Sequence, residues 1–289
     1  GCRPQFILVA LLAFVIFWPQ IQSIFRHASN DSSLPHMSVW RLMRAPLAVL
    51  LPALIVIVPL LAYNVVRFGS PLDFGTSYQM TVTDMTSYRQ PLSNLALTVA
   101  YYLFLPLRFT SEFPFIGMMP IAFREWGYYE PMAGGLFTAC PLLLLALAAP
   151  FLRRRMHRSG YWGLATCSLA LAVLLTVFDS HTAGLGWRYI CDFGWMMAIA
   201  ALVPMLYLMH PGGDAIVAGA PDPSERNEPR RDVTKRHPMM LACVRGLVVA
   251  ALMASIILAV LACFIPGRDD SLINNNPVLY DTVVAWFRL

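Results

Sequence analysis

Apolar runs of nearly twenty residues, separated by short stretches that carry arginine, constrain this chain more than any other feature. A bilayer core about 30 Å thick is crossed by roughly 20 apolar residues, because an α-helix rises about 1.5 Å per residue. Hydrophobic residues make up 58% of the sequence and charged residues 13%, whereas about a quarter of the residues of soluble domains are charged. The sequence therefore predicts an all-α fold, a polytopic transmembrane helix bundle with about six spans.

The predicted spans follow the apolar runs. They cover about residues 5–21, 45–63, 132–152, 161–178, 189–208 and 240–264. A further apolar stretch, residues 92–107, does not fit the alternation of sides as a single crossing, and we interpret it as an interfacial or re-entrant helix. A hairpin of two crossings is the alternative, although its return arm, residues 113–123, is short and contains two prolines.

Basic residues collect in alternate connections between the predicted spans, which indicates the side of each connection because cytoplasmic loops are enriched in Lys and Arg. The connections predicted to be cytoplasmic hold Arg26, Arg41 and Arg44, then Arg153, Arg154, Arg155 and Arg158, and then Arg226, Arg230, Arg231, Lys235 and Arg236. This pattern accounts for the formal charge of +5. We therefore expect no nucleic-acid partner.

The whole chain, residues 1–289, is interpreted as one transmembrane domain and as a fragment of a longer protein, because it begins without Met and its first apolar run lacks a signal-peptide cleavage pattern. Residues 64–131 are predicted to form an extracytoplasmic loop with an interfacial helix. Residues 209–239 mix Pro, Gly and both signs of charge, which is typical of a disordered cytoplasmic loop. Residues 265–289 are predicted to form an extracytoplasmic tail that contains a short amphipathic helix.

Charged side chains are nearly absent from the predicted spans and gather at their outer ends. They are Arg67, Asp73, Asp84, Arg89, Arg108, Glu112, Arg124, Glu125, Glu130, Asp179, Arg188 and Asp192. A proton-coupled transporter usually places an ionisable group at the middle of the bilayer, and none is visible here. This distribution suits a substrate whose polar head lies at the membrane surface while its lipid tail stays in the membrane.

The segment YNVVRFGSPLDFGTSYQ, residues 63–79, is the first candidate site. A guanidinium fork matches the geometry of a phosphate, so Arg67 is predicted to hold a phosphate while Tyr78 or Gln79 contacts the headgroup. Asp73 completes the predicted substrate-binding set of this segment. The alternative interpretation is an aromatic belt at the membrane surface with an Arg67–Asp73 pair that anchors the loop.

The segment GLGWRYICD, residues 184–192, is the second candidate site. Arg188 and Asp192 are four residues apart, so on a helix they face the same way and can pair. Arg188 and Tyr189 are predicted to contact a phosphate or a sugar, with Asp192 orienting the guanidinium. The alternative is that the Arg188–Asp192 pair is only structural.

Other kinds of chemistry find little support in the sequence. The six cysteines lie mostly in apolar runs, as small buried hydrophobic side chains do, and no Cys or His spacing is typical of a zinc site. No nucleotide-binding loop, dinucleotide fingerprint or nucleophile elbow is present. No cofactor is certain, and a divalent cation held by carboxylates and a ligand phosphate stays an option.

Several short motifs together resemble a known superfamily. They are YNVVRFGSPLDFG, TSYQMTV, FPFI, WRYICDF and NPVLYDTVVAWF. Taken together, the chain resembles the C-terminal half of bacterial polytopic proteins of the GT-C glycosyltransferase superfamily. The resemblance implies a polyprenyl-phosphate-linked sugar as donor, a protein, lipid or glycan as acceptor, and a reaction on the extracytoplasmic side of the bacterial inner or plasma membrane.

The resemblance also implies where catalysis lies. The acidic catalytic motif of the superfamily is in the first outer loop near the N-terminus, and this chain contains no such loop, so its catalytic residues are unknown. Donor-phosphate or structural roles would fall to Arg67, Asp73, Tyr78, Arg188 and Asp192, which we expect to gather around one cavity. The alternative from another class is a non-enzymatic membrane protein, such as a transporter or flippase component for lipid-linked glycans.

Overall fold

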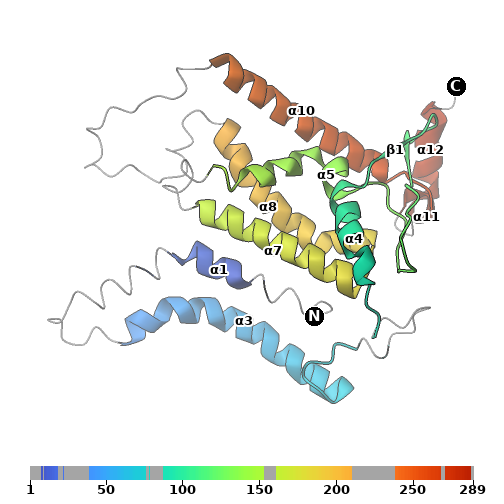
Figure 1. The fold of residues 1–289 in the computed structure, drawn as a ribbon. Helices are drawn as coiled ribbons and strands as arrows, with labels where there is room; N and C mark the ends of the chain where they lie inside the picture. Colours follow the sequence, from blue (N-terminus) through green and yellow to red (C-terminus); the bar gives the residue numbers. More distant parts are fainter. Residues whose placement is uncertain are drawn as a thin grey trace. The chain divides into compact units, whose positions relative to one another are not determined.

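The computed structural model describes residues 8, 10–18, 22, 39–75, 78, 87–152, 161–209, 238–267 and 271–287. Contacts divide the chain into two compact units, Gly1–Tyr88 and Arg89–Leu289. The boundary falls inside the predicted outer loop, residues 64–131. We describe each unit by itself, and Figure 1 shows the helices of both.

The first unit contains helices α1 (Ala10–Ile16) and α3 (Val39–Phe68). Helix α3 has 30 residues, which corresponds to about 45 Å of helix, and it includes all of the predicted span 45–63. It ends at Gly69, which adopts a φ of 77° and donates its N–H to the Val65 carbonyl over 2.9 Å. A left-handed glycine after the last turn is a common helix stop.

The longest helices described in the second unit are α4 (Leu92–Phe104), α7 (Tyr161–Thr182), α8 (Ile190–Met209) and α10 (Pro238–Ala262). Three stretches among the described residues are long and apolar enough to cross a membrane. They are Tyr161–Thr182, Trp187–Met209 and Ala242–Ala262. They coincide with the last three predicted spans, and they identify the chain as a membrane protein with a mostly helical fold.

Helix α10 has the surface expected of a helix in contact with lipid. Leu247, Met253, Ile257 and Val260 are all exposed. In water such a row of apolar side chains would be unfavourable, whereas lipid tails are as apolar as these side chains. The exposed face of α10 is therefore consistent with a bilayer around it.

The predicted span over residues 132–152 is not one continuous helix. It folds as α5 (Leu136–Ala139) and the 3₁₀ helix η3 (Pro141–Ala148). Between them Cys140 is not helical, with φ −134° and ψ 77°. Proline supplies no backbone N–H and disfavours the α conformation of the residue before it, so Pro141 interrupts the run.

Close packing against α4 also shapes this broken run. A Cβ atom on Gly135 would lie 2.5 Å from the backbone nitrogen of Leu105, and Thr138 donates its hydroxyl to the Leu105 carbonyl over 2.6 Å. Only glycine permits this approach of the two backbones. Periodicity alone could not reveal the break, since every side chain of η3 is apolar.

The remaining elements follow the predictions more closely. Residues 92–104 form the helix α4, which at 13 residues is about 20 Å long and shorter than a crossing. The predicted return arm is not a helix, because β1 (Arg108–Phe109) pairs antiparallel with β2 (Ile116–Gly117). The tail is helical as predicted, in α11 (Leu272–Asn275) and α12 (Pro277–Phe287).

In Figure 1, α7, α8 and α10 extend between the same two ends of the second unit. Helix α7 ends, α8 begins and α10 ends at the same end of the second unit, together with the loop of residues 105–135. We call it the polar end. Helix α7 begins, α8 ends and α10 begins at the opposite end, and in the sequence the arginine-bearing segments 153–160 and 210–237 directly adjoin these helix ends.

Tyr102 on α4 joins the helices at the polar end. Its hydroxyl donates to the Gly184 carbonyl over 2.8 Å and accepts the Gly186 N–H over 2.9 Å. Its ring meets Phe193 edge to face, with centroids 5.4 Å apart. Burial raises the pKa of the Tyr102 phenol far above its usual range, so the phenol stays neutral and keeps both bonds.

Replacing Tyr102 by Phe should lower the thermal stability of the detergent-solubilised protein. The change leaves the carbonyl of Gly184 and the N–H of Gly186 buried without their partner, at about 1–3 kcal/mol for each group. The matched control is Tyr101→Phe, which removes a hydroxyl that donates to the Ala122 carbonyl over 3.0 Å at an exposed site. Equal unfolding temperatures for the two variants would contradict the role given to Tyr102.

Candidate functional site

Residues 127–131 form an extended segment that runs beside the turn between α7 and α8. Leu185 donates its N–H to the Tyr128 carbonyl over 3.1 Å, and Glu130 donates its N–H to the Leu185 carbonyl over 2.7 Å. The turn needs Gly184, whose φ is 77° and whose Cβ would lie 2.5 Å from the Tyr128 oxygen. Side chains alternate along an extended segment, so Tyr128 and Glu130 lie on one side and Tyr129 on the other.

An ion pair with two tyrosines around it forms where this segment meets the start of α8. Nη2 of Arg188 lies 2.6 Å from Oε1 of Glu130, and the Tyr128 hydroxyl donates to the same oxygen over 3.1 Å. The guanidinium also lies 5.6 Å from the ring centroid of Tyr189. We call Tyr128, Glu130, Arg188 and Tyr189 the Arg188 cluster.

The cluster holds a positive charge in a defined position without burying it. The Arg188 side chain is 63% exposed and that of Glu130 is 24% exposed, and an arginine carries five N–H donors in a planar fork. The single carboxylate oxygen that pairs with Nη2 leaves room for a second anion on the exposed side. Gly186 makes the approach possible, since its Cβ would lie 2.9 Å from Oε2 of Glu130.

An apolar cavity of about 330 Å³ lies between α5, α8 and α10, and its lining includes Trp187 and Ile190, the chain neighbours of Arg188 and Tyr189. Its lining includes Gly134, Leu136, Trp187, Ile190, Leu258 and Ala262. Trp187 connects the two features, because it lines the cavity and precedes Arg188 in the chain. The polar end therefore combines an exposed cation with an apolar cavity.

In the first unit, the candidate Arg67 is held by aromatic side chains. It donates to the Tyr63 hydroxyl, and its guanidinium carbon lies 5.7 Å from the Tyr63 ring centroid and 5.3 Å from that of Phe68. Tyr78 stacks on Phe68 with centroids 5.3 Å apart. Arg67 and Tyr78 are thus joined through Phe68.

Asp73 has a turn-forming role in the same segment. Its Oδ1 accepts the Gly75 N–H over 2.8 Å, as aspartate side chains commonly do in turns. The alternative interpretation, an Arg67–Asp73 pair, therefore differs from the structure. Arg67 contacts Tyr63 instead, and Asp73 contacts the Gly75 backbone. Asn64 fixes the other side of the turn, donating to the Pro71 carbonyl over 3.1 Å.

The structure distributes the predicted site residues over the two units. Arg67, Asp73 and Tyr78 belong to the first unit, and Arg188, Tyr189 and Asp192 belong to the second. Gln79 lies outside the described residues. The expectation that one cavity gathers residues of both segments therefore stays a prediction.

One predicted contact differs from the structure. Arg188 pairs with Glu130 rather than with Asp192, which is 2% exposed in the first turn of α8. The reason is that residues 187–189 form the separate short 3₁₀ helix η5, so Arg188 and Asp192 do not share one α-helical face. Glu130 belonged to the polar residues noted at the outer ends, but nothing in its spacing pointed to Arg188.

Among the described residues, no group of three or more His, Cys, Asp or Glu side chains is placed to hold a metal ion. A divalent cation that depends on a ligand phosphate stays a prediction. Comparison with protein-family models, with curated proteins and with solved structures gave no match. The resemblance to the GT-C superfamily therefore rests on the sequence motifs alone.

Replacing Glu130 by Gln should lower the pKa of the Tyr128 phenol. Burial raises the pKa of Tyr128 above its usual value, and the negative charge of Glu130 and its hydrogen bond raise it further, so the neutral amide removes part of the shift. The ring ¹³Cζ resonance of Tyr128, followed by NMR against pH, measures it. Glu125→Gln is the control, and an unchanged Tyr128 titration in Glu130→Gln would contradict the described cluster.

Proposed function

We propose that the chain is the membrane-embedded C-terminal portion of a multi-pass glycosyltransferase of the bacterial inner or plasma membrane. It would move a sugar from a polyprenyl-phosphate donor to an extracytoplasmic glycan, lipid or protein acceptor. One observation carries the proposal: an exposed arginine directly follows, in the chain, a tryptophan that lines an apolar cavity at one end of apolar helices. The catalytic carboxylate would lie in a part of the protein upstream of this sequence.

The Arg188 cluster suits the phosphate of such a donor. Transfer of the sugar leaves negative charge on the lipid phosphate, and a guanidinium placed in advance stabilises that charge without reorganisation. Glu130 fixes the orientation of the fork through Nη2, and Tyr128 fixes Glu130. The exposed N–H groups of Arg188 would then bind the phosphate oxygens.

The apolar cavity suits the first isoprene units of the lipid. Burial of apolar surface contributes about 25 cal/mol per Å² to the free energy of binding. Apart from Trp187, only small and aliphatic side chains line the cavity. Aromatic side chains such as Trp prefer the depth of the lipid headgroups. Trp187 would therefore mark the level at which the tail ends and the phosphate begins.

The charge distribution supports an extracytoplasmic position for the Arg188 cluster. The segments 153–160 and 210–237 carry most of the basic residues of this unit, and in the sequence they adjoin the helix ends that lie opposite the polar end. Lys and Arg in short connections stay on the cytoplasmic side. The polar end would consequently face away from the cytoplasm, where a polyprenyl-linked sugar is used.

A non-enzymatic role is the second candidate, and the state of Glu130 favours it. The described carboxylate nearest to the exposed Arg188 already accepts a bond from Tyr128 and pairs with the guanidinium, so it is not placed to take a proton from an acceptor. A flippase or transporter component for lipid-linked glycans would need only the phosphate and tail contacts. Binding of the donor without transfer by the complete protein would identify this role.

Replacing Arg188 by Ala in the complete protein should lower sugar transfer from a polyprenyl-phosphate donor by about a hundredfold, because a preorganised charge is lost at the departing phosphate. Arg188→Lys should restore part of the rate, since it keeps the charge without the fork. Arg108→Ala is the control, because Arg108 is an exposed arginine in β1 outside the cluster. Unchanged transfer by an Arg188→Ala protein with normal expression would refute the role of Arg188.

A further inference from the structure

A second feature lies on the other face of the extended segment from the Arg188 cluster. It is an open cavity of about 320 Å³ in the loop that follows β2, lined by Phe123, Arg124, Glu125, Trp126, Gly127 and Tyr129. Because side chains alternate along the extended segment, Tyr129 faces this cavity while Glu130 faces Arg188. We call the cavity the aromatic cup.

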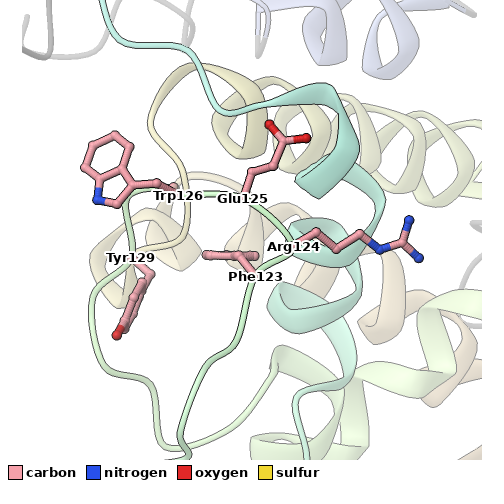
Figure 2. Close-up of a pocket in the computed structure, with 6 residues that line it drawn as sticks. Phe123, Arg124, Glu125, Trp126 and Tyr129 are labelled. Atoms are coloured by element: carbon pink, nitrogen blue, oxygen red, sulfur yellow. The ribbon is translucent and has the colours of Figure 1, made fainter.

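Aromatic rings form the walls of the cup. Figure 2 shows Trp126 and Tyr129 at the left of the view and Phe123 to their right, while Arg124 points away from all three rings. Phe123 meets Tyr129 edge to face at 6.1 Å between centroids, and Tyr101 of α4 supports Phe123 at 5.9 Å. The rings are therefore held by one another and by α4.

The backbone beneath the cup is fixed by a buried asparagine. Oδ1 of Asn94 accepts the N–H groups of Arg124 and Glu125 over 3.1 and 3.4 Å. Nδ2 of Asn94 donates to the Glu125 carbonyl over 3.0 Å. One fully buried side chain on α4 thus satisfies three backbone groups of the loop, which accounts for a polar residue in an otherwise apolar helix.

Two further contacts complete the frame. The Ser93 hydroxyl donates to Oε1 of Glu125 over 2.8 Å, which ties the loop to the start of α4, and Figure 2 shows this carboxylate pointing away from Tyr129. A Cβ atom on Gly127 would lie 2.8 Å from Nε2 of Gln90, so glycine lets the loop lie directly on that side chain. The cup is preorganised, and binding would order little additional chain.

We propose that the aromatic cup binds a sugar ring. Trp126 is 71% exposed and Tyr129 is 49% exposed, so a fixed loop presents two large rings to a ligand. A pyranose has apolar C–H faces that pack on aromatic rings. The cavity volume is at the lower end of the range for small-molecule sites, about 300–1,000 Å³.

An aromatic belt at the membrane surface is the competing explanation, because Trp and Tyr are enriched at that depth. A belt requires neither a cavity nor a loop fixed by a buried side chain, and both are present here. The cup is therefore assigned to a saccharide rather than to lipid. The inference rests on the proposed function only for the origin of the sugar, which would be the acceptor glycan of the transfer reaction.

The test measures binding of neutral disaccharides to the whole chain in phospholipid nanodiscs, using saturation-transfer NMR with cellobiose, chitobiose and maltose. At least one should receive saturation from the wild-type protein. Trp126→Ala and Tyr129→Ala should each weaken its binding by about tenfold. Trp286→Ala is the matched control, because Trp286 is 72% exposed on α12, and it should bind as the wild type does.

Absence of saturation transfer to all three sugars would overturn the assignment, and so would equal binding by the wild type and Trp126→Ala. Quenching of Trp126 fluorescence by brominated phospholipid would also overturn it. The Trp126 signal is the difference in fluorescence between the wild type and Trp126→Phe. Arg188→Ala separates this inference from the proposed function, since it should leave disaccharide binding unchanged. Sugar binding by a complete protein that shows no transferase activity would refute the transferase and keep the cup.

Discussion

The buried hydroxyl of Tyr102 holds the turn on which the rest of the polar end depends. It hydrogen-bonds to the backbone of the residues on both sides of Leu185. The backbone of Leu185 in turn hydrogen-bonds to the segment that contains Tyr129 and Glu130. The same turn leads directly into Arg188. One side chain on α4 therefore positions, through two backbone segments, both the ion pair of Arg188 and the wall of the aromatic cup.

The bilayer explains why these polar contacts are concentrated at helix ends. A charged group at the middle of a transmembrane helix costs about 2.5 to 3.5 kcal/mol on insertion scales, whereas backbone groups outside helices need partners wherever water is excluded. Asn94 and Tyr102 supply such partners from α4 to two loop segments. The loops at the polar end can thus be irregular and rigid at once, which a binding site requires.

The sequence predicted α7, α8, α10 and α12 well, because lipid crossing and amphipathicity leave a strong pattern in the chain. It could not show the break at Pro141, which depends on packing against α4. The i, i+4 spacing on a helix favoured Asp192 as the partner of Arg188, but in the structure Arg188 pairs with Glu130 from a distant segment. Nothing in the sequence indicated the role of Asn94, and only the fold reveals that it anchors the loop of the cup.

The central claim is that the polar end of the second unit faces away from the cytoplasm. Cysteine labelling in intact cells tests it directly, with Glu112→Cys in the hairpin at the polar end and Arg226→Cys in the segment 210–237, each in a background whose six native cysteines are replaced. A membrane-impermeant maleimide should label position 112 in intact cells and position 226 only after permeabilisation. Labelling of both positions under the same condition, or the reverse pattern, would contradict the account.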